Sequence, residues 1–322
     1  MSEAEQSADP SSLRPVTAIV GPTAVGKSAV AEGLAALLGG EIVSADSMQV
    51  YRGMDIGTAK QPPHKRGVPY HCIDLVEPGA PYSAALYQRH ARAAFADIRA
   101  RGLVPVLVGG TGLYVRAALD EMEFPMGEYV SPVRTALEAQ AETLGLEGLH
   151  RLLAERDPAS AALIHPNNVR RVVRALELLE TGGPTYAEQA AHFTDRRAAV
   201  PAILIGLAME RSALYARIDA RVDAMLASGL LAEVAALVEA GYRDALTATQ
   251  AIGYKELLPV LERGADLADA VAAIKQATRR YAKRQLTWFR ADPRVSWIDV
   301  TELSPAAAVS AARALVESKE SD

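Results

Sequence analysis

The stretch Gly21-Pro22-Thr23-Ala24-Val25-Gly26-Lys27-Ser28 decides how the rest of the chain is interpreted. It matches the phosphate-loop pattern G-x-x-x-x-G-K-S, and it lies between an apolar run, residues 16–20, and a segment of helical period, residues 29–38, as that motif requires. Its glycines let the backbone turn sharply, so that N–H groups and a helix N-terminus point at phosphate oxygens. Lys27 adds a positive charge, and the Ser28 hydroxyl is placed to hold Mg²⁺. The stretch therefore predicts a phosphate site, without saying whose phosphate it binds.

Length and composition set the outer limits. The chain has 322 residues, half of them hydrophobic, which is enough for one large or two ordinary domains with a sizeable core. Residues 1–15 are polar and have no apolar centre, so we expect a loose, disordered tail there and no signal peptide. No apolar run approaches the ~20 residues of a membrane helix. We therefore expect no membrane anchor, and nothing in the sequence demands more than a monomer.

The single cysteine and the net charge bear on environment and partners. Cys72 allows no internal disulfide, and a lone thiol fits a reducing cytoplasm. Its neighbour His71 suggests a metal pair, but a buried strand end is favoured because no other Cys or His cluster completes a site. The net charge of −5 argues against nucleic acid on average, yet one basic face is enough to bind RNA.

Apolar runs that alternate with segments of helical period predict the fold class. They indicate a parallel sheet with helices on both faces, here a P-loop NTPase-like α/β fold. Ligands bind such sheets at the carboxyl ends of the strands. Asp46 and the Gly-Gly-Thr-Gly of residues 109–112 each follow a strand, so they should open onto the same crevice as the phosphate loop. The expected strands are residues 16–20, 41–45, 70–75, 104–108, 201–209 and 295–300, and the expected helices of this part are 28–38, 83–101, 213–228, 231–240, 250–262, 267–290 and 305–317.

Between residues 125 and 200 the strand signals vanish. Pro and Gly divide this stretch into helical segments, so it reads as an all-helical block between strands. Such a block predicts an inserted helical subdomain, residues 123–200, in a core made of residues 16–122 and 201–322. The expected helices of the insertion are residues 132–144, 148–155, 158–163 and 168–180.

Asp46 and Thr23 are the candidate catalytic residues. A carboxylate at the carboxyl end of a strand and close to bound phosphate can accept a proton from an incoming nucleophile; a helix cap is the plain alternative. The long polar and glycine-rich segment 46–60 favours a function for Asp46, because long loops in compact domains are usually functional. Thr23 can donate a hydrogen bond to the departing phosphate oxygen, or its hydroxyl can be satisfied by the loop backbone.

Three groups of basic residues could bind phosphates. Arg217 and Arg221 lie four residues apart on one expected helix and could clamp a phosphate, although a solvated face paired with Asp219 and Asp223 is favoured for these residues alone. Two further groups in an acidic protein favour RNA binding more than either does alone, although the second of them by itself is more typical of an amphipathic helix. They are Arg170, Arg171 and Arg174 in the insertion, and the basic and aromatic run of residues 279–290.

Seven segments in order make one family recognisable. They are GPTAVGKS from Gly21, DSMQVYRGMDIGTAK from Asp46, LVGGTGLY from Leu107, HPNNVRRVVRALE from His165, RIDARVDAMLASGL from Arg217, QAIGYKE from Gln250 and RRYAKRQLTWFR from Arg279. With these segments the sequence resembles the bacterial tRNA dimethylallyltransferases, which are isopentenyl-diphosphate:tRNA transferases. The resemblance extends from residue 16 to about residue 300, and the segment that starts at Asp46 is the most specific.

The resemblance implies a reaction and a set of roles. The dimethylallyl group of dimethylallyl diphosphate would pass to the exocyclic N6 amine of the adenosine on the 3′ side of the anticodon in tRNA, and diphosphate would be released. Asp46 would be the general base, Thr23 would assist the departing oxygen, and Ser28 would position Mg²⁺. The implied diphosphate ligands are Gly21, Pro22, Thr23, Ala24, Val25, Gly26, Lys27, Ser28 and Arg221, with Arg217 as a second arginine. The implied tRNA contacts are Asp46, Ser47, Met48, Gln49, Thr111, Arg134, Arg170, Arg171, Arg174, Gln250, Gly253, Tyr254 and Lys255, to which the basic helix adds Arg279 and Lys283.

Other function classes share parts of this pattern. A nucleoside or small-molecule kinase would use the same loop on ATP·Mg²⁺ and would carry a lid with several arginines. A GTPase is disfavoured because no N-K-x-D guanine motif occurs. The intact Lys27, Ser28 and Asp46 speak against an RNA-binding protein with a vestigial loop. A cytokinin-forming isopentenyltransferase, which acts on free adenine nucleotides, is disfavoured by the insertion and the basic helix.

Overall fold

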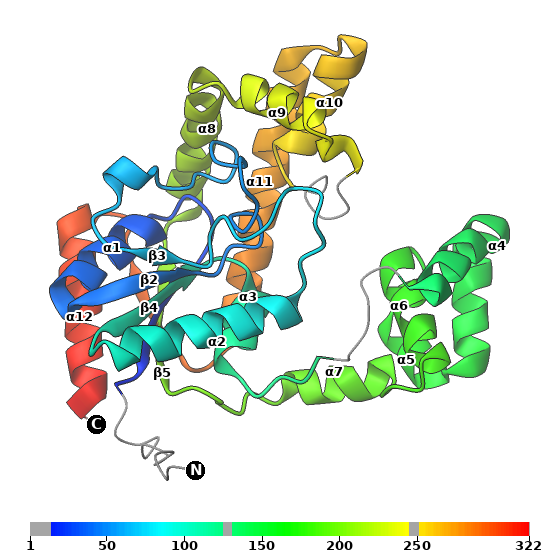
Figure 1. Cartoon of the computed structure of the whole chain (residues 1–322), viewed down its shortest axis with the longest axis horizontal. Coiled ribbons are helices and arrows are strands. Elements are labelled where there is room, and N and C mark those ends of the chain that lie inside the picture. The colour runs from blue at the N-terminus through cyan, green and yellow to red at the C-terminus, as the bar shows by residue number, and fades with distance from the viewer. Residues whose placement is uncertain (1–13, 125–130, 245–250, 322) are drawn as a thin grey trace, which may run out of the picture. The chain divides into compact units, whose positions relative to one another are not determined.

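The computed structural model describes residues 14–124, 131–244 and 251–321. The chain divides into two compact units, which are described separately below. The first consists of residues 1–120 and 198–322, and the second of residues 121–197 (Figure 1). The tail expected at residues 1–15 lies outside the described residues except for its last two. Within the described ranges, no helix combines the length and the apolar character needed to cross a membrane.

Six parallel strands form the sheet of the first unit, in the order β3-β2-β4-β1-β5-β6. The central strands β1 and β4 are buried along their whole length, and this is why their sequences are near-continuous apolar runs. Ile19 of β1 pairs with Val108 of β4 on one side and with Ile205 of β5 on the other. The bounds are β1 (Val16–Val20), β2 (Gly40–Ser44), β3 (Tyr70–His71), β4 (Val104–Gly109), β5 (Ala202–Ala208) and β6 (Val295–Asp299).

Helices cover both faces of this sheet, as the sequence predicted (Figure 1). Val30 of α1, Ile218 of α8 and Ala312 of α12 belong to one buried apolar cluster with alternate residues of the strands. Helices α2 and α3 pack on each other and against β4 and form the opposite layer. The bounds are α1 (Lys27–Leu38), α2 (Ala84–Ala100), α3 (Gly112–Leu119), α8 (Arg211–Ala227) and α12 (Pro305–Ser321).

A group of helices stands beyond the carboxyl edge of the sheet. The long helix α11 packs against α8 and α10 and reaches α3, so it connects the outer helices with the sheet edge (Figure 1). Asp266 caps the N-terminus of α11 by accepting hydrogen bonds from the N–H groups of Ala268 and Asp269. The bounds are α9 (Leu230–Glu239), α10 (Tyr254–Arg263) and α11 (Leu267–Arg290), and short 3₁₀ turns occupy Pro63–Lys65 and Tyr242–Asp244.

The second unit is helical throughout its described part. Its own core contains Leu149 and Leu153 of α4 and Val172 and Leu176 of α6, so its packing does not depend on the sheet. Asp157 caps α5 by accepting a hydrogen bond from the N–H of Ser160. The bounds are α4 (Pro132–Arg156), α5 (Pro158–Leu163), α6 (Val169–Glu180) and α7 (Tyr186–Thr194).

The chain leaves the first unit and returns to it at neighbouring positions. Asp120 and Ala198 form an isolated antiparallel bridge. The fully buried Asp120 carboxylate makes ion pairs with Arg116 and Arg294, each at 2.7 Å, and Arg294 also pairs with Asp292. A buried carboxylate needs such partners because its charge has lost its water. Two arginines thus anchor the chain where the second unit begins.

Several elements differ from the expectations. β3 has two residues where we expected six, because Cys72 and Asp74 adopt positive φ angles of 60° and 52° that end the strand. The two helices expected between residues 132 and 155 are both present within α4, separated by a break at Gly145, where φ is 68°. α10 begins at Tyr254, later than the expected start at residue 250. α3 and α7 were not expected.

Candidate active site

The phosphate loop has the backbone geometry that its sequence predicts. Ala24 and Gly26 have φ angles of 65° and 104°, and Gly26 is the N-cap of α1. At Gly21 the φ angle is 142°, and a Cβ atom would lie 2.6 Å from the carbonyl oxygen of Leu207 on β5. The loop therefore depends on glycine at its first position. The Lys27 Nζ donates a hydrogen bond to the carbonyl oxygen of Pro22 at 2.7 Å and so lies across the loop.

The charges around Lys27 favour an anion. Burial and the neighbouring Arg221 guanidinium lower the pKa of Lys27 from 10.5 to about 7, while the Asp46 carboxylate opposes this shift. Burial also lowers the pKa of Arg221. Two basic groups thus lie close together at a helix N-terminus. A bound anion would favour the charged form of Lys27 and would pair with the Arg221 guanidinium, because an opposite charge favours the protonated form.

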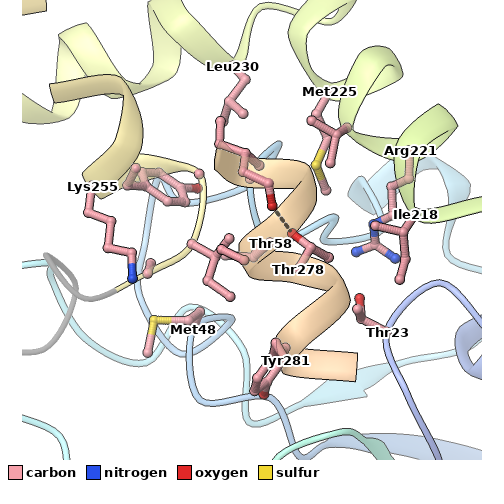
Figure 2. Close-up of a pocket in the computed structure, with 18 of the residues that line it drawn as sticks. Thr23, Met48, Thr58, Ile218, Arg221, Met225, Leu230, Lys255, Thr278 and Tyr281 are labelled. Carbon is pink, nitrogen blue, oxygen red and sulfur yellow. Dashed lines mark hydrogen bonds between the residues drawn. The ribbon is translucent and has the colours of Figure 1, made fainter. Parts of the chain in front are cut away.

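Two cavities meet beside the loop. The larger has a volume of about 410 Å³, and the smaller, of about 80 Å³, reaches Lys27 and Ser28. Thr23, Asp46 and Arg221 line both, so the reacting groups of a substrate could meet there. In Figure 2, Thr23, Ile218 and Arg221 lie on the right of the larger cavity, and Met48 and Lys255 lie on the left. Its apolar lining comes from Ile218, Val222, Met225, Leu230 and Ile274.

Asp46 lies at the carboxyl edge of the sheet, two residues after β2. One of its carboxylate oxygens, Oδ1, accepts a hydrogen bond from the N–H of Met48 at 2.9 Å. The adjoining Ser47 N–H donates to the Oγ1 of Thr111, at 3.1 Å, so the turn after β4 supports the turn after β2. One bond therefore holds the carboxylate itself, and the other holds the backbone of the turn that carries it.

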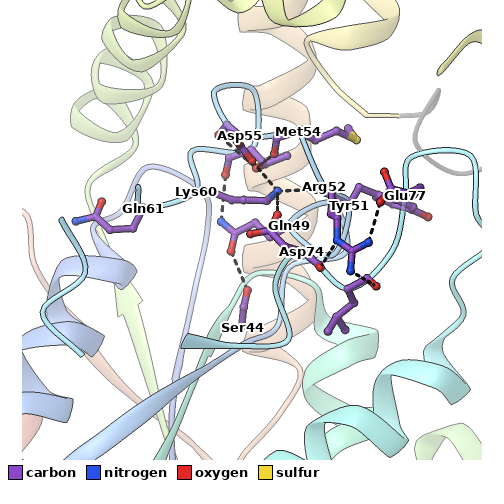
Figure 3. A network of polar contacts seen from close by, with 12 residues as sticks. Ser44, Gln49, Tyr51, Arg52, Met54, Asp55, Lys60, Gln61, Asp74 and Glu77 are labelled. Atoms are coloured by element: carbon purple, nitrogen blue, oxygen red, sulfur yellow. Dashed lines mark hydrogen bonds and ion pairs between the residues drawn. The ribbon is translucent and has the colours of Figure 1, made fainter. Parts of the chain in front are cut away.

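The segment after Asp46 is held mainly by its own polar side chains (Figure 3). The buried Lys60 ammonium pairs with Asp55 at 2.8 Å and with Asp74 at 2.6 Å. Gln49 accepts a hydrogen bond from the Ser44 hydroxyl at 2.8 Å, and its amide nitrogen donates to the Thr58 carbonyl at 3.2 Å. These contacts shape the wall of the cavity. Lys60 therefore has an internal partner for its charge and a structural function.

Glu233 on α9 fastens the same segment to the outer helices. Its carboxylate accepts hydrogen bonds from three successive N–H groups, those of Asp55, Ile56 and Gly57, at 2.7 to 3.1 Å. It also accepts one from the hydroxyl of Tyr254 on α10, at 2.6 Å. Successive N–H groups form a nest for a negative charge, and here the protein supplies that charge itself.

Helix α11 presents its basic residues on two faces. Arg279 is ion-paired with Asp219 of α8 at 2.8 Å, and Lys283 is exposed. Arg280 and Arg284 instead line the larger cavity together with Tyr281. The Arg284 guanidinium lies 5.6 Å from the centre of the Tyr281 ring, within the range of a cation–π contact.

Comparison with known proteins identifies the family. A family model described as IPP transferase matches residues 49–292. A tRNA dimethylallyltransferase of Geobacillus kaustophilus is 48% identical over 294 residues, which cover 91% of this chain and 93% of that protein. The chain belongs to the IPP transferase family. The resemblance seen in the sequence is thereby confirmed.

Two solved structures share the fold of this family member. The full-length tRNA isopentenylpyrophosphate transferase of Bacillus halodurans is 42% identical, with a TM-score of 0.68 over 96% of this chain and 98% of that one. A eukaryotic dimethylallyltransferase, described as acting on tRNA, is 30% identical, with a TM-score of 0.76 over 95% of this chain and 78% of that one. The predicted α/β fold class is confirmed.

The structure brings only part of the expected site together in this IPP transferase family member. The phosphate loop, Asp46 and Arg221 meet at the cavities; Arg217 is exposed and lines, with Arg221, an outer hollow against the phosphate loop at Lys27 and Ser28. Gln250 lies outside the described residues. Near the larger cavity lie Ser47, Met48, Gly253, Tyr254 and Lys255 as its lining, Thr111 behind Ser47, and Gln49 within the polar network.

The expected residues of the insertion belong to the second unit. Arg170 and Arg171 are exposed on α6. Arg174 is ion-paired with the buried Glu177 at 2.7 Å, and Arg134 lies 3.6 Å from Glu138 on α4. The first two therefore have the more accessible charges, and the contacts of all four with RNA stay a prediction.

His71 and Cys72 each have surroundings of their own at the end of β3. The His71 Nε2 is 2.6 Å from a carboxylate oxygen of Glu41, and burial raises the pKa of the Cys72 thiol to about 12. Among the residues described, no three His, Cys, Asp or Glu side chains gather as a metal-binding group would require. Four residues of the site were not assigned a function from the sequence, namely Glu233, Arg280, Arg284 and Gln285. The last three lie in the basic run of residues 279–290, which the sequence did indicate as a whole.

Proposed function

We propose that this protein transfers the dimethylallyl group of dimethylallyl diphosphate to the N6 amine of the adenosine on the 3′ side of the anticodon in tRNA. The observation that carries the proposal is that Thr23, Asp46 and Arg221 line two connected cavities beside an intact phosphate loop. Membership of the IPP transferase family supports it, as does the name of the relative that is 48% identical. The enzyme would act as a monomer in the cytoplasm.

The phosphate loop would bind the diphosphate of the donor. Its N–H groups and the N-terminus of α1 offer positive dipole ends, and Lys27 and Arg221 offer charge. As the bond between the allylic carbon and the diphosphate oxygen breaks, negative charge grows on that oxygen. Thr23, on the cavity wall, would donate a hydrogen bond to it. Arg221 lines both cavities and therefore is the arginine that we assign to the diphosphate; Arg217 would act from the outer side.

Asp46 would complete the exchange on the other reactant. An adenine amine is a poor nucleophile because its lone pair is delocalised into the ring. As the carbon–nitrogen bond forms, the bond between the allylic carbon and the diphosphate oxygen breaks. Asp46 would accept the proton that N6 loses. The target base must leave its stack to reach Asp46, at a cost of a few kcal/mol, which is smallest in a single-stranded loop.

The residues present suit a magnesium ion as cofactor. Mg²⁺ prefers oxygen ligands, keeps several waters and commonly takes one or two protein ligands with phosphate oxygens. Ser28 opens α1 and lines the smaller cavity, to which Asp46 also contributes oxygens. Ser28 would hold the ion. When bound, the ion would neutralise charge on the diphosphate leaving group.

The RNA would be gripped by residues around the cavity and on the helical unit. Met48, Lys255 and Tyr281 line the larger cavity, where the extruded base would enter. Basic residues on the helical unit and on α11 would contact the RNA backbone. We assign this contact to Arg134, Arg170, Arg171, Arg174, Arg279, Lys283, Arg280 and Arg284.

The test is direct. The purified protein is incubated with Mg²⁺, dimethylallyl diphosphate and tRNA that lacks the modification, and the digested nucleosides are analysed by mass spectrometry. We expect adenosine that carries one dimethylallyl group, at the position next to the anticodon. A reaction without prenylated adenosine, or one that prenylates free AMP in preference to tRNA, would refute the proposal.

A further inference from the structure

Three turns at the carboxyl edge of the sheet must keep a fixed spacing if Thr23 and Asp46 are to act on one substrate. They are the phosphate loop after β1, the turn that begins at Asp46 after β2, and the turn of Gly110 and Thr111 after β4. A displacement of about 1 Å between reacting groups can cost on the order of 100-fold in rate. Contacts that join the three turns must therefore set this spacing.

Gln285 of α11 makes a hydrogen bond with two of these turns at once. Its Oε1 accepts from the N–H of Thr23 at 2.8 Å, and its Nε2 donates to the carbonyl oxygen of Gly110 at 2.9 Å. The residue is 5% exposed. A Cβ atom at Gly110 would lie 2.1 Å from the Gln285 Nε2, so the turn has no room for a side chain there. The amide is thus enclosed and uses both of its ends.

The third turn joins through Thr111, the residue that follows Gly110 in the chain. Tyr281, one turn before Gln285 on α11, lines both cavities, and burial raises its pKa to about 12. Thr111 in turn accepts a hydrogen bond from the N–H of Ser47, next to Asp46. In Figure 2, Tyr281 projects from α11 at the lower border of the cavity, near Thr23. The two hydrogen bonds of Gln285, the peptide link from Gly110 to Thr111 and the hydrogen bond from Ser47 to Thr111 therefore connect Thr23 with the Asp46 turn.

We propose that Gln285 is a positioning residue that holds the Thr23 side of the phosphate loop in register with the Asp46 turn for the transfer step. The inference rests on the function proposed above. Gln285 also lines the smaller cavity, but both ends of its amide are already bonded to the backbone of Thr23 and Gly110, and through these two bonds it acts on the loop. Only a side chain of this length that both accepts and donates can join an N–H to a carbonyl across this gap.

The chemistry of the amide decides the choice of variants. Gln285→Met keeps the volume and removes both hydrogen bonds, which leaves the Thr23 N–H and the Gly110 carbonyl without this partner. Gln285→Glu keeps an acceptor for the Thr23 N–H but loses the donor to Gly110. Gln276→Met is the matched control, because Gln276 is exposed on the same helix.

The experiment uses the full chain with dimethylallyl diphosphate and an unmodified anticodon stem-loop RNA. For Gln285→Met we expect kcat to fall about tenfold or more, the KM for RNA to stay within about threefold, and Gln276→Met to match the wild type. Gln285→Glu should lie between the wild type and Gln285→Met. A variant that only lost stability would show a lower Tm with unchanged kcat, and that result would overturn the assignment, as would equal rates for Gln285→Glu and Gln285→Met.

A second measurement separates this proposal from the function on which it rests. Calorimetry measures the affinity of the protein for inorganic diphosphate in the presence of Mg²⁺. This affinity depends on the phosphate loop and not on the acceptor of the dimethylallyl group. We expect Gln285→Met to weaken that binding about threefold or more, and Gln276→Met to leave it unchanged. If the wild type transfers nothing to RNA, the proposed function fails, and the diphosphate affinities still decide whether Gln285 positions the loop. Unaltered diphosphate affinity in Gln285→Met would then refute it.

Discussion

The ammonium of Lys27 lies between two charges with opposite effects on its pKa. Arg221 lowers that pKa and Asp46 raises it, while burial has the largest effect and brings it to about 7. At pH 8 the free protein therefore holds Lys27 mostly neutral. A bound anion raises the pKa again, so binding above pH 7 must take up a proton, and the affinity for the anion should fall as the pH rises above 7.

This proton uptake can be measured. Calorimetry of inorganic diphosphate with Mg²⁺ at pH 8, in two buffers of different ionisation enthalpy, gives the number of protons bound. We expect the wild type to take up more protons than Lys27→Met, because the protons exchanged by the ligand itself are common to both. Equal uptake by the two proteins would contradict the assignment of the shifted group to Lys27.

Asp46 allows a second prediction at the residue scale. Asp46→Asn keeps an oxygen that can accept the hydrogen bond of the Met48 N–H, but the amide cannot take the proton of the amine. We expect turnover to fall by ~10²-fold or more while the RNA still binds. Single-turnover transfer and RNA binding are measured side by side, with the exposed Asp97→Asn as control. Turnover that matched the control would remove Asp46 from the role of base.

At the scale of elements, α11 is the helix whose two faces should behave differently. Arg279 is already paired with Asp219, whereas Arg280 and Arg284 line the cavity. We expect the double variant of Arg280 and Arg284 to alanine to weaken RNA binding more than the double variant of Arg279 and Lys283. Each lost phosphate contact should also reduce, by about 1, the slope of the logarithm of the RNA association constant against the logarithm of the salt concentration.

The comparison of the two double variants is decided by binding titrations at several salt concentrations. The transfer rate at saturating RNA is measured as well, because Arg284 is close to Tyr281. Equal salt slopes for both double variants and the wild type would mean that α11 is an ordinary amphipathic helix. A larger loss of RNA affinity in the double variant of Arg279 and Lys283 would instead support the sequence-based expectation that these two residues contact tRNA.

At the scale of the whole molecule, the buried Asp120 should dominate the stability of the point where the second unit begins. Asp120→Ala leaves Arg116 and Arg294 without the carboxylate that they share, and breaking a buried pair in this way costs about 3–5 kcal/mol. Asp97→Ala is the matched control: Asp97 also pairs with an arginine four residues away, but it is 62% exposed. Its removal should cost about 1 kcal/mol or less.

Unfolding by denaturant gives the free energy of unfolding of both variants. Each variant removes one aspartate that lies four residues from an arginine partner; Asp120 differs from Asp97 in its burial and in its second partner, Arg294. Similar free energies of unfolding for Asp120→Ala and Asp97→Ala would show that the buried cluster adds no more than a surface pair.

Much of the fold was predictable because its signals are local. The phosphate loop, Asp46 and the strand runs depend on neighbours in the sequence, and the structure has them where they were expected, apart from the shorter β3. The order of the strands was not predictable, since it is set by crossovers and not by any one segment. α3 was missed because it is short and begins within the Gly-Gly-Thr-Gly motif, which reads as a turn.

The supports of the site were missed for a different reason. The hydrogen bond from Thr23 to Gln285 joins residues 262 positions apart, and Glu233 lies 178 positions from the Asp55 N–H that it binds. No spacing rule spans such distances. Arg279 shows the converse, because a basic residue on a helix looked available until its partner on another helix was known.

The bridge between Asp120 and Ala198 also bears on how such a protein can be altered over generations or by design. A segment whose two ends meet can be exchanged as a cassette, since the host needs to close only a short gap. The N–H of Glu121 donates to the carbonyl of Arg197 at 2.8 Å, so the ends of the segment are paired on its own side as well. Residues 121–197 could therefore be replaced by a helical unit of another length or charge, while the contacts that hold the carboxyl edge of the sheet stay unchanged.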